Sequence, residues 1–279
     1  LASAAQRLLR RYAAVPAARI AVLGANVEAY RAALDALNVG VEVPLLLEMR
    51  TRVDTTSESL ARTLAARGTR VVPGAAIYAA HANGRGELAA IELAKREEGS
   101  WRAAGGERIE LDGVWMSTGF APANALLLQT GALMRYDHRL RQYVPETLPA
   151  GVYACGKVNG AYDLEDRLAD GARAGHAAAA HCGFAAPLPA AALVFREEPN
   201  FDEAILEHPQ GRNFVDFDED LQLKDLAGAV QEGFDSPELL KRYTTVGMGP
   251  SQGKHSNLNA LRALARMRGV GIETLGTTT

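Results

Sequence analysis

The sequence has only two cysteines in 279 residues, Cys155 and Cys182, and they do not form a Cys-x-x-Cys pair. A fold held together by disulfides is therefore excluded, and so is a metal site with four thiolates from one chain. This cysteine usage is typical of a reducing compartment, and we expect a cytoplasmic protein.

Long apolar runs and an excess of basic residues are also missing. No stretch of about 18 uncharged apolar residues occurs, so the sequence predicts no membrane-spanning helix. Lys and Arg total 30 against 33 Asp and Glu, which does not favour a nucleic acid or an anionic membrane as partner. The chain begins at Leu1 and ends in three threonines, and we expect a piece of a longer polypeptide.

What remains is a chain with 48% hydrophobic residues, enough for a sizeable core. Its apolar pattern predicts a first domain over residues 1–115 with α/β character. A short apolar run, a Gly-containing turn, a helix and a second apolar run make one β-α-β unit. The strands are expected at 20–23, 41–47, 70–72, 75–80, 88–95 and 108–111, and the helices at 28–37 and 57–66.

The rest of the chain divides at a change of composition. After a strand over 114–116, residues 116–195 are predicted to continue the α/β fold, with a strand over 151–155, an Ala-rich helix over 163–181 and a linker over 185–191. Residues 196–279 are predicted to be helical. Ser236 and Pro237 give a helix start with a cap and a first-position proline, and the last helix is expected over 258–268.

The first candidate site is the turn Gly-Ala-Asn-Val-Glu-Ala at residues 24–29, between a strand and a helix. A dinucleotide turn has a glycine at its centre so that the backbone can approach a pyrophosphate. Asn26 stands there instead, and Glu28 adds a negative charge to the first helical turn. These residues favour a Rossmann-like half that binds nothing, although Glu48 follows where a ribose-binding acid is expected.

The second and third candidates are also glycine-rich turns before helices. Residues 156–164 expose backbone N–H groups that suit an anion or a nucleotide, with Asp163 as helix cap or ribose partner. Residues 242–257 combine glycines with cations and hydroxyls, a set that suits a phosphate. An ordinary capped helix and a solvated turn are the alternatives, and no metal site or catalytic set is predicted.

Two motifs make the middle of the chain resemble the pyridine nucleotide–disulfide oxidoreductases. Residues 114–124, with Thr118-Gly119 and Pro122, resemble the exit motif of their second domain, and residues 152–160 resemble their late nucleotide motif. The resemblance implies a Rossmann-like FAD/NAD(P)-binding fold followed by a small α-helical domain. The acid that normally holds the flavin ribityl chain is replaced by Lys157, which favours another dinucleotide.

Three further stretches resemble the α subunits of heterotetrameric sarcosine oxidases. They are residues 29–35, 214–220 and, above all, 240–254, with 276–279 after them. That family's α subunit holds NAD where relatives hold a flavin. The resemblance places this NAD site by position on Gly156, Lys157, Gly160, Tyr162, Asp163 and Leu164.

The same resemblance implies a partner and further cofactors. In that family FMN lies at the interface with the β subunit, to which it is attached. The expected contacts from this chain are Arg242, Thr244, Thr245, Gln252, Lys254 and Ser256. The complete enzyme contains other small subunits and FAD on β. It oxidises sarcosine to glycine, passes the one-carbon unit to tetrahydrofolate and releases H2O2. The fragment alone is expected to be inactive.

The helical part also resembles the small [2Fe–2S] domain of bacterioferritin-associated ferredoxins. The cysteine positions of that domain fall near Asp216 and Asp218 and on Ser251 and Ser256, so no cluster can form. We expect a polar site there that serves the flavin phosphate.

Three other functions stay open from the sequence. An NAD(P)H-dependent flavoprotein reductase could use Arg50 and Arg52, just past Glu48, to bind a 2′-phosphate. The chain could instead be a scaffold that only docks a partner, or an α-type subunit of a related amine or opine oxidase.

Overall fold

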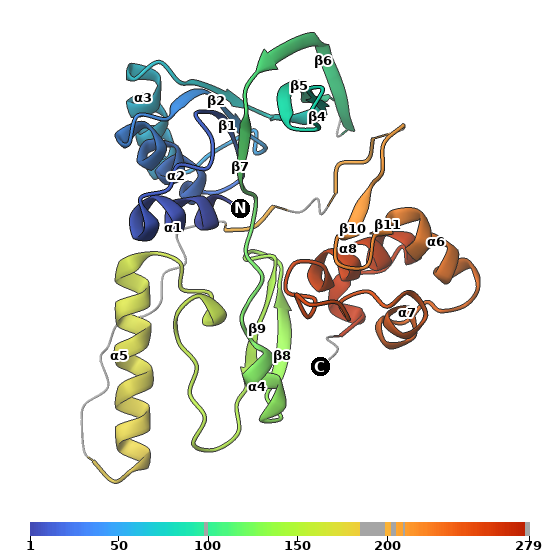
Figure 1. Cartoon of the computed structure of the whole chain (residues 1–279). Coiled ribbons are helices and arrows are strands. Elements are labelled where there is room, and N and C mark those ends of the chain that lie inside the picture. The colour runs from blue at the N-terminus through green and yellow to red at the C-terminus, as the bar shows by residue number, and fades with distance from the viewer. Residues whose placement is uncertain (98–99, 185–198, 202–204, 209, 277–279) are drawn as a thin grey trace. The chain divides into compact units, whose positions relative to one another are not determined.

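The computed structural model describes residues 1–279 except 98–99, 185–198, 202–204, 209 and 277–279 (Figure 1). The chain forms two compact units. Unit 1 is Leu1–Phe120 with Pro199–Phe201, and unit 2 is Ala121–Glu198 with Asp202–Thr279. The predicted linker over 185–191 lies outside the described residues, and the division into three domains stays a prediction.

Unit 1 is built on a four-stranded parallel sheet with the strand order β3-β2-β1-β7. The central strands are continuously apolar, as strands covered on both faces are. The strands are β1 (Arg19–Gly24), β2 (Glu42–Glu48), β3 (Arg70–Pro73) and β7 (Gly113–Ser117).

Three helices share one apolar core with this sheet, namely α1 (Ala2–Tyr12), α2 (Val27–Asn38) and α3 (Thr55–Ala66). Tyr30 on α2 packs there with Ile20, Val22 and Trp115 from the strands. The three helices and the sheet are coloured blue to cyan, with β7 in green, in Figure 1. The predicted β-α-β unit is confirmed.

A second, antiparallel sheet is inserted before β7 returns to the parallel sheet. It runs β4 (Ala75–Ala82), β5 (Leu88–Glu97) and β6 (Ser100–Glu110), in that order. The three strands expected here are confirmed, and β6 begins earlier than predicted. Because β7 then pairs with β1 in parallel, residues far apart in the sequence meet at the same edge of the parallel sheet.

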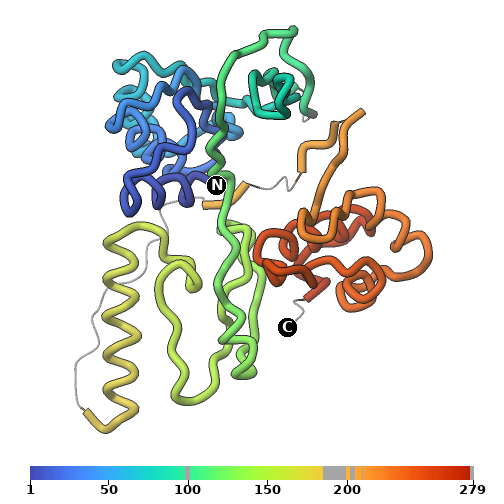
Figure 2. The backbone as a smooth tube through the Cα atoms, in the orientation of Figure 1, coloured from blue at the N-terminus to red at the C-terminus, as the bar shows by residue number. Residues whose placement is uncertain are grey.

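Unit 2 combines a β-hairpin, one long helix and a group of shorter helices (Figure 2). Its first part contains α4 (Ala125–Gln129), β8 (Leu133–Asp137), β9 (Gln142–Thr147), the 3-10 turn η1 (Gly156–Asn159) and α5 (Leu164–His181). Its second part contains β10 (Phe214–Asp216), β11 (Leu221–Gln222), α6 (Leu223–Gln231), α7 (Pro237–Thr244), α8 (Asn257–Arg268) and η2 (Ile272–Thr274).

The two parts of unit 2 are joined by hydrogen bonds. Tyr143 on β9 donates its hydroxyl proton to the carbonyls of Ile272 and Gly276, and Arg262 on α8 donates to the carbonyl of Arg141. Burial raises the pKa of Tyr143 to about 12, so the hydroxyl keeps its proton well above neutral pH. The helical part has its own core around Leu226, Leu240 and Leu264.

The structure corrects one predicted element and adds others. The strand expected over 151–155 does not form, because no described strand pairs with it and an isolated extended segment is not a stable strand. The hairpin β8–β9 and the short helix α4 were not expected. Helix α3 starts at Thr55 with Asp54 as its cap, earlier than predicted. Among the described residues, no helix has the length and apolar character needed to cross a bilayer.

Helix α2 crosses β1 so closely that Gly24 has no room for a side chain. A Cβ atom added to Gly24 would lie 2.4 Å from the Cβ of Ala29. We expect Gly24→Ala to lower the free energy of unfolding of unit 1 by about 1–3 kcal/mol, because the helix must move. Urea unfolding followed by tryptophan fluorescence measures this, since both tryptophans of the chain, Trp101 and Trp115, lie in unit 1.

Gly84 is the matched control, because a Cβ there meets no atom within 4 Å. Gly84→Ala is expected to change the same free energy by less than about 0.5 kcal/mol. Equal losses in the two variants would contradict the close helix–strand contact.

Candidate functional site

The carboxyl edge of the parallel sheet in unit 1 brings three candidate residues together. In the strand register Gly24 is paired with Glu48 on one side and with Ser117 on the other. This is the edge at which open α/β sheets bind ligands. The turn at residues 24–29 therefore lies at this edge of the sheet.

Asn26 is used by the fold itself. It caps α2 by accepting from the amide of Glu28, accepts from the Ser117 hydroxyl at 2.9 Å, and donates to the carbonyl of Pro199 at 3.1 Å. The side chain is buried. These contacts agree with the interpretation that the turn is not a free dinucleotide cradle.

Glu48 and Arg50 form a closed, buried network at the end of β2. Glu48 is fully buried, accepts from the Tyr30 hydroxyl at 2.9 Å and pairs with the Arg50 guanidinium at 2.9 Å. Asp54 accepts from the amide and hydroxyl of Ser57 and lies 3.4 Å from Arg50. Burial and the Glu48 carboxylate together raise the pKa of Tyr30 well above its usual value.

This network corrects two expectations. Glu48 is bound to Arg50 and Tyr30 rather than presented to a ribose. Arg50 faces Glu48 instead of a 2′-phosphate, which leaves only Arg52, on the exposed turn, of the pair proposed for NADPH. Both changes have one physical cause: a buried carboxylate must be paired, and the nearest cation is two residues away.

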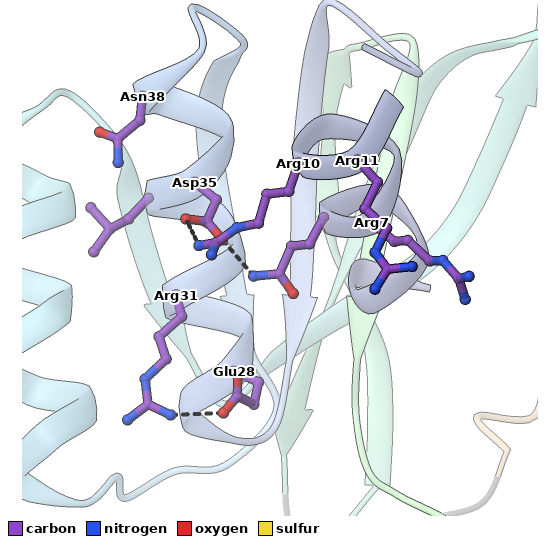
Figure 3. A pocket seen from close by; sticks show the side chains of 9 residues that line it. Arg7, Arg10, Arg11, Glu28, Arg31, Asp35 and Asn38 are labelled. Atoms are coloured by element: carbon purple, nitrogen blue, oxygen red, sulfur yellow. Dashed lines mark hydrogen bonds and ion pairs between the residues drawn. The ribbon is translucent and has the colours of Figure 1, made fainter. Parts of the chain in front are cut away.

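A charged cleft of about 640 Å³ lies between α1 and α2 (Figure 3). The ion pair Arg10–Asp35 joins α1 to α2, with 2.6 Å between nitrogen and oxygen, and the pair Arg31–Glu28 lies along α2 at 2.7 Å. The cleft is open and hydrophilic and was not foreseen from the sequence. Its lining includes four arginines and two carboxylates, and the two ion pairs involve only Arg10 and Arg31 of the arginines.

The late motif in unit 2 is organised by one buried carboxylate, Asp170 on α5. Its oxygens accept from the amide of Gly156 at 2.8 Å and from the side-chain amide of Asn159, and Arg173 binds it at 2.6 Å. Arg173 also donates to the carbonyl of Ala154. Asp170 therefore holds the turn onto α5. The sequence did not single out this residue, although it lies on the helix that directly follows the motif.

Four of the predicted site residues lie around this turn. Gly156 and Gly160 adopt left-handed backbone conformations, with φ of 81° and 90°. The Lys157 ammonium lies 5.5 Å from the centre of the Tyr162 ring, and the Tyr162 hydroxyl donates to Gln142. Gln142 in turn donates to the carbonyl of Lys157 at 3.0 Å, so turn, ring and hairpin are connected.

The remaining two residues of that motif start α5. Asp163 is the predicted cap, and it accepts from the amide of Glu165 at 2.9 Å. Leu164 is exposed. Glu165 and Asp166 add acidic charge to the first turn, so the helix start favours hydroxyl donors over a phosphate. The cations of this region are Lys157 on the turn and Arg167 and Arg173 on α5.

The third candidate, the turn between α7 and α8, is held by carboxylates from the β10–β11 turn. Buried Asp216 accepts from the amide of Gly247 at 2.8 Å, and Asp218 accepts from the amide of Ser251 at 2.7 Å. Hydrogen bonds from Ser251 hold the pKa of Asp218 below its usual value. The segments predicted to correspond to the ferredoxin ligands do meet, but as carboxylate–amide pairs.

The centre of this turn is filled by Asn257, the first residue of α8. A Cβ atom at Gly247 would lie 1.9 Å from the side-chain oxygen of Asn257, so a glycine is required there. Among the described residues, no group of three or more His, Cys, Asp or Glu side chains could hold a metal ion.

Two of the residues predicted to contact FMN bond within the fold, and a third is buried. Thr244 is buried and its hydroxyl donates to the carbonyl of Leu240. Thr245 ends α7 in a left-handed conformation and donates to Glu219. Ser256 is buried, and its hydroxyl has no hydrogen-bond partner among the described residues.

The other three predicted residues are on the surface. Gln252 and Lys254 are exposed on the turn, and Arg242 on α7 lies 3.6 Å from Glu238, an exposed pair. The structure adds two residues that the sequence did not single out. Phe217 and Met248 are 79% and 53% exposed, and they lie on the two loops that the Asp216–Gly247 bond joins.

The Glu48 network yields a stability prediction. Glu48→Ala would leave the buried Arg50 guanidinium with only the longer contact to Asp54, and we expect it to cost about 3 kcal/mol of unfolding free energy. Glu42→Ala breaks an exposed pair with Arg19 in the same unit and should cost at most about 1 kcal/mol. Urea unfolding followed by tryptophan fluorescence compares them; a similar small loss in both would show that Arg50 does not depend on Glu48.

Comparisons with known proteins agree with this architecture. The family model described as pyridine nucleotide-disulphide oxidoreductase matches residues 2–181, and the model described as sarcosine oxidase A3 domain matches residues 210–279. The solved structure of L-proline dehydrogenase from P. horikoshii superposes with a TM-score of 0.68 at 15% identity, over 99% of this chain and 50% of that chain. This last likeness shows the fold alone.

Two curated relatives are both sarcosine oxidase subunit alpha. The protein from Corynebacterium sp. (strain P-1) is 31% identical over 295 residues, and that from Rhizobium meliloti (strain 1021) is 30% identical over 285 residues. Each comparison includes 100% of this chain but only 29% and 27% of the relative, so the chain spans less than a third of their length. The resemblances to the oxidoreductase family and to sarcosine oxidase α subunits are confirmed: the chain belongs to the pyridine nucleotide-disulphide oxidoreductase family and carries, after that fold, the A3 domain of sarcosine oxidase.

Proposed function

We propose that this chain is part of the α subunit of a heterotetrameric sarcosine oxidase that acts in the cytoplasm. The observation that carries the proposal is the presence in one chain of an oxidoreductase fold over 2–181 and the A3 domain over 210–279, both within relatives named sarcosine oxidase subunit alpha. The complete complex would oxidise sarcosine to glycine, transfer the one-carbon unit to tetrahydrofolate and release H2O2. The described residues bind and orient; none is proposed to be catalytic.

The first role that we propose for the chain is to bind NAD at residues 156–164. Its support is the placement of Lys157 and Tyr162 on the turn that Asp170 fixes to α5; the Gly156 amide is bonded to Asp170, so the site relies on these side chains rather than on that amide. Lys157 supplies the positive charge for a pyrophosphate, and the carboxylates at the start of α5 can accept from ribose hydroxyls. A flavin is favoured less, because Lys157 cannot accept a hydrogen bond from a ribityl hydroxyl.

The second role is to contribute one side of the interface with the β subunit and its FMN. The interior of the A3 turn does not fit a phosphate, because Asp216 and Asp218 already occupy the amides of Gly247 and Ser251. The contact is therefore proposed on the surface, at Arg242, Gln252 and Lys254. Exposed Phe217 and Met248 would pack against the β subunit, since apolar side chains exposed to this extent are typical of interaction sites.

The alternatives are weighed by the same contacts. Pairing of Arg50 with Glu48 removes a cation that the NAD(P)H reductase hypothesis needs. A pure docking scaffold would not need the organised turn at Gly156. A subunit of a related amine or opine oxidase would use the same α-side contacts, so the substrate has to be identified on the assembled enzyme.

Lys157→Ala tests the NAD site. Loss of one charge-assisted contact to phosphate is expected to weaken NAD binding about tenfold. Isothermal titration of the chain with NAD measures the dissociation constant. Lys224→Ala, an exposed lysine on α6 of the same unit, is the control and should leave that constant unchanged. Unchanged affinity in Lys157→Ala would remove the proposed site.

A second test addresses the FMN contact in the complete complex. Replacing Arg242 and Lys254 together by Ala should release FMN during dialysis, or weaken the pairing of the α and β subunits, because the two exposed cations of the proposed contact are lost. Arg268→Ala at the opposite end of α8 is the matched control. The measured quantity is the flavin content per complex, and full retention in the double variant would refute the contact.

A further inference from the structure

A short segment from a distant part of the sequence lies at the carboxyl edge of the parallel sheet in unit 1, where a dinucleotide would bind; we call this the dinucleotide edge. Pro199–Phe201 follows α5 along the chain, yet it belongs to unit 1. The amide of Phe201 donates to the carbonyl of Thr118 at 3.2 Å, and the side-chain oxygen of Asn200 accepts from the amide of Phe120. All three residues of the segment are buried.

The contacts of this segment are with the residues that a bound dinucleotide would need. Its pyrophosphate would lie over the turn after β1, at the start of α2. There the amide group of Asn26 reaches the carbonyl of Pro199 at 3.1 Å, and its oxygen is shared between Ser117 and Glu28. The segment and Asn26 together thus occupy the space between the ends of β1 and β7.

The fit on the β7 side is equally close. A Cβ atom at Gly119 would lie 2.9 Å from the side-chain oxygen of Asn200. The Phe201 ring meets Trp101 edge to face, with centroids 6.5 Å apart, and the Arg96 guanidinium lies 5.9 Å from the Phe201 ring centre. An aromatic anchor of this kind holds a segment in place beyond its backbone hydrogen bonds.

We infer that the dinucleotide edge of unit 1 is a docking site for the chain's own segment Pro199–Phe201, which takes the place of NAD(P)H. A nucleotide would have to displace three hydrogen bonds and return the buried Asn200 and Phe201 to water. This inference does not rest on the proposed NAD site, which lies on residues 156–164 in the other unit.

Hydrogen–deuterium exchange on the full chain, with and without millimolar NADPH, tests the inference. In the native chain NADPH should give no protection of peptides over residues 24–31 and 117–120. In the double variant Asn26→Gly/Asn200→Ala, exchange over 117–120 without nucleotide should be at least tenfold faster. NADPH should then protect both stretches, with binding at least tenfold tighter than in the native chain.

Matched variants keep the test decisive. Asn38→Ala replaces an exposed asparagine at the far end of α2 and should behave as the native chain does. The single variant Asn200→Ala removes one bond only and should show an intermediate rise in exchange over 117–120. Protection of 24–31 in the native chain would overturn the inference, and so would unchanged exchange or no gain in binding in the double variant.

Protection of residues 156–164 is read separately. A footprint there with NAD bears on the proposed function alone, because those residues lie in unit 2. The two ideas can therefore fail independently.

Discussion

Both units depend on one constraint: the backbone N–H groups of their glycine-rich turns must be paired with hydrogen-bond acceptors. Such groups cannot be buried without an acceptor, and they are also what makes these turns suitable for anions. In this chain the acceptors are its own side chains. Asp170 accepts from Gly156, Asp216 from Gly247, Asp218 from Ser251 and Asn200 from Phe120. Each of these bonds joins segments that are at least 14 residues apart in the sequence.

This use of side chains decides which turns can still take a ligand. In the A3 domain Asp216 and Asp218 bind the amides of Gly247 and Ser251, so these two amides are used by the fold and the carboxylates add negative charge to the turn. In unit 1 the acceptors are uncharged: the side-chain oxygen of Asn200 accepts from the amide of Phe120, and the carbonyl of Pro199 accepts from the side chain of Asn26. At the late motif a single carboxylate, Asp170, is paired with Arg173, and the turn itself carries Lys157. Of the three candidate turns, the late motif is thus the one whose electrostatics best suit a nucleotide.

Local patterns predicted local structure well. The apolar runs gave the strands β1 and β2, and the capping residues Asp163 and Ser236 start α5 and α7 as expected. Strand 151–155 failed because its apolar pattern is compatible with a strand but cannot supply a partner strand. The partners of Glu48 could not be read from spacing either: Arg50 lies two residues away, but only burial forces the pairing.

The same limit applies to the site residues: their membership of a turn could be predicted, but the direction of their side chains could not. A motif identifies which residues share a turn, and Gly156 to Leu164 do share one. It does not show whether a polar side chain points outward or holds the fold. Thr244 and Ser256 were grouped with Arg242 and Lys254 by sequence, yet the first two are buried. The acceptors that hold the turns come from distant segments, which no pattern within the turn contains.

The exchange of an acid for Lys157 connects these observations to the cofactor. An acid at that position accepts from a hydroxyl and repels a phosphate, whereas an ammonium does the reverse. The start of α5 carries Asp163, Glu165 and Asp166, so the acceptors for hydroxyls have not been lost but lie on the helix. A nucleotide placed with its phosphates toward Lys157 and a ribose toward the helix satisfies both charges. In the NAD site that we propose, this orientation would let the single exchange of an acid for Lys157 shift the preferred cofactor from a flavin to NAD while the fold is kept.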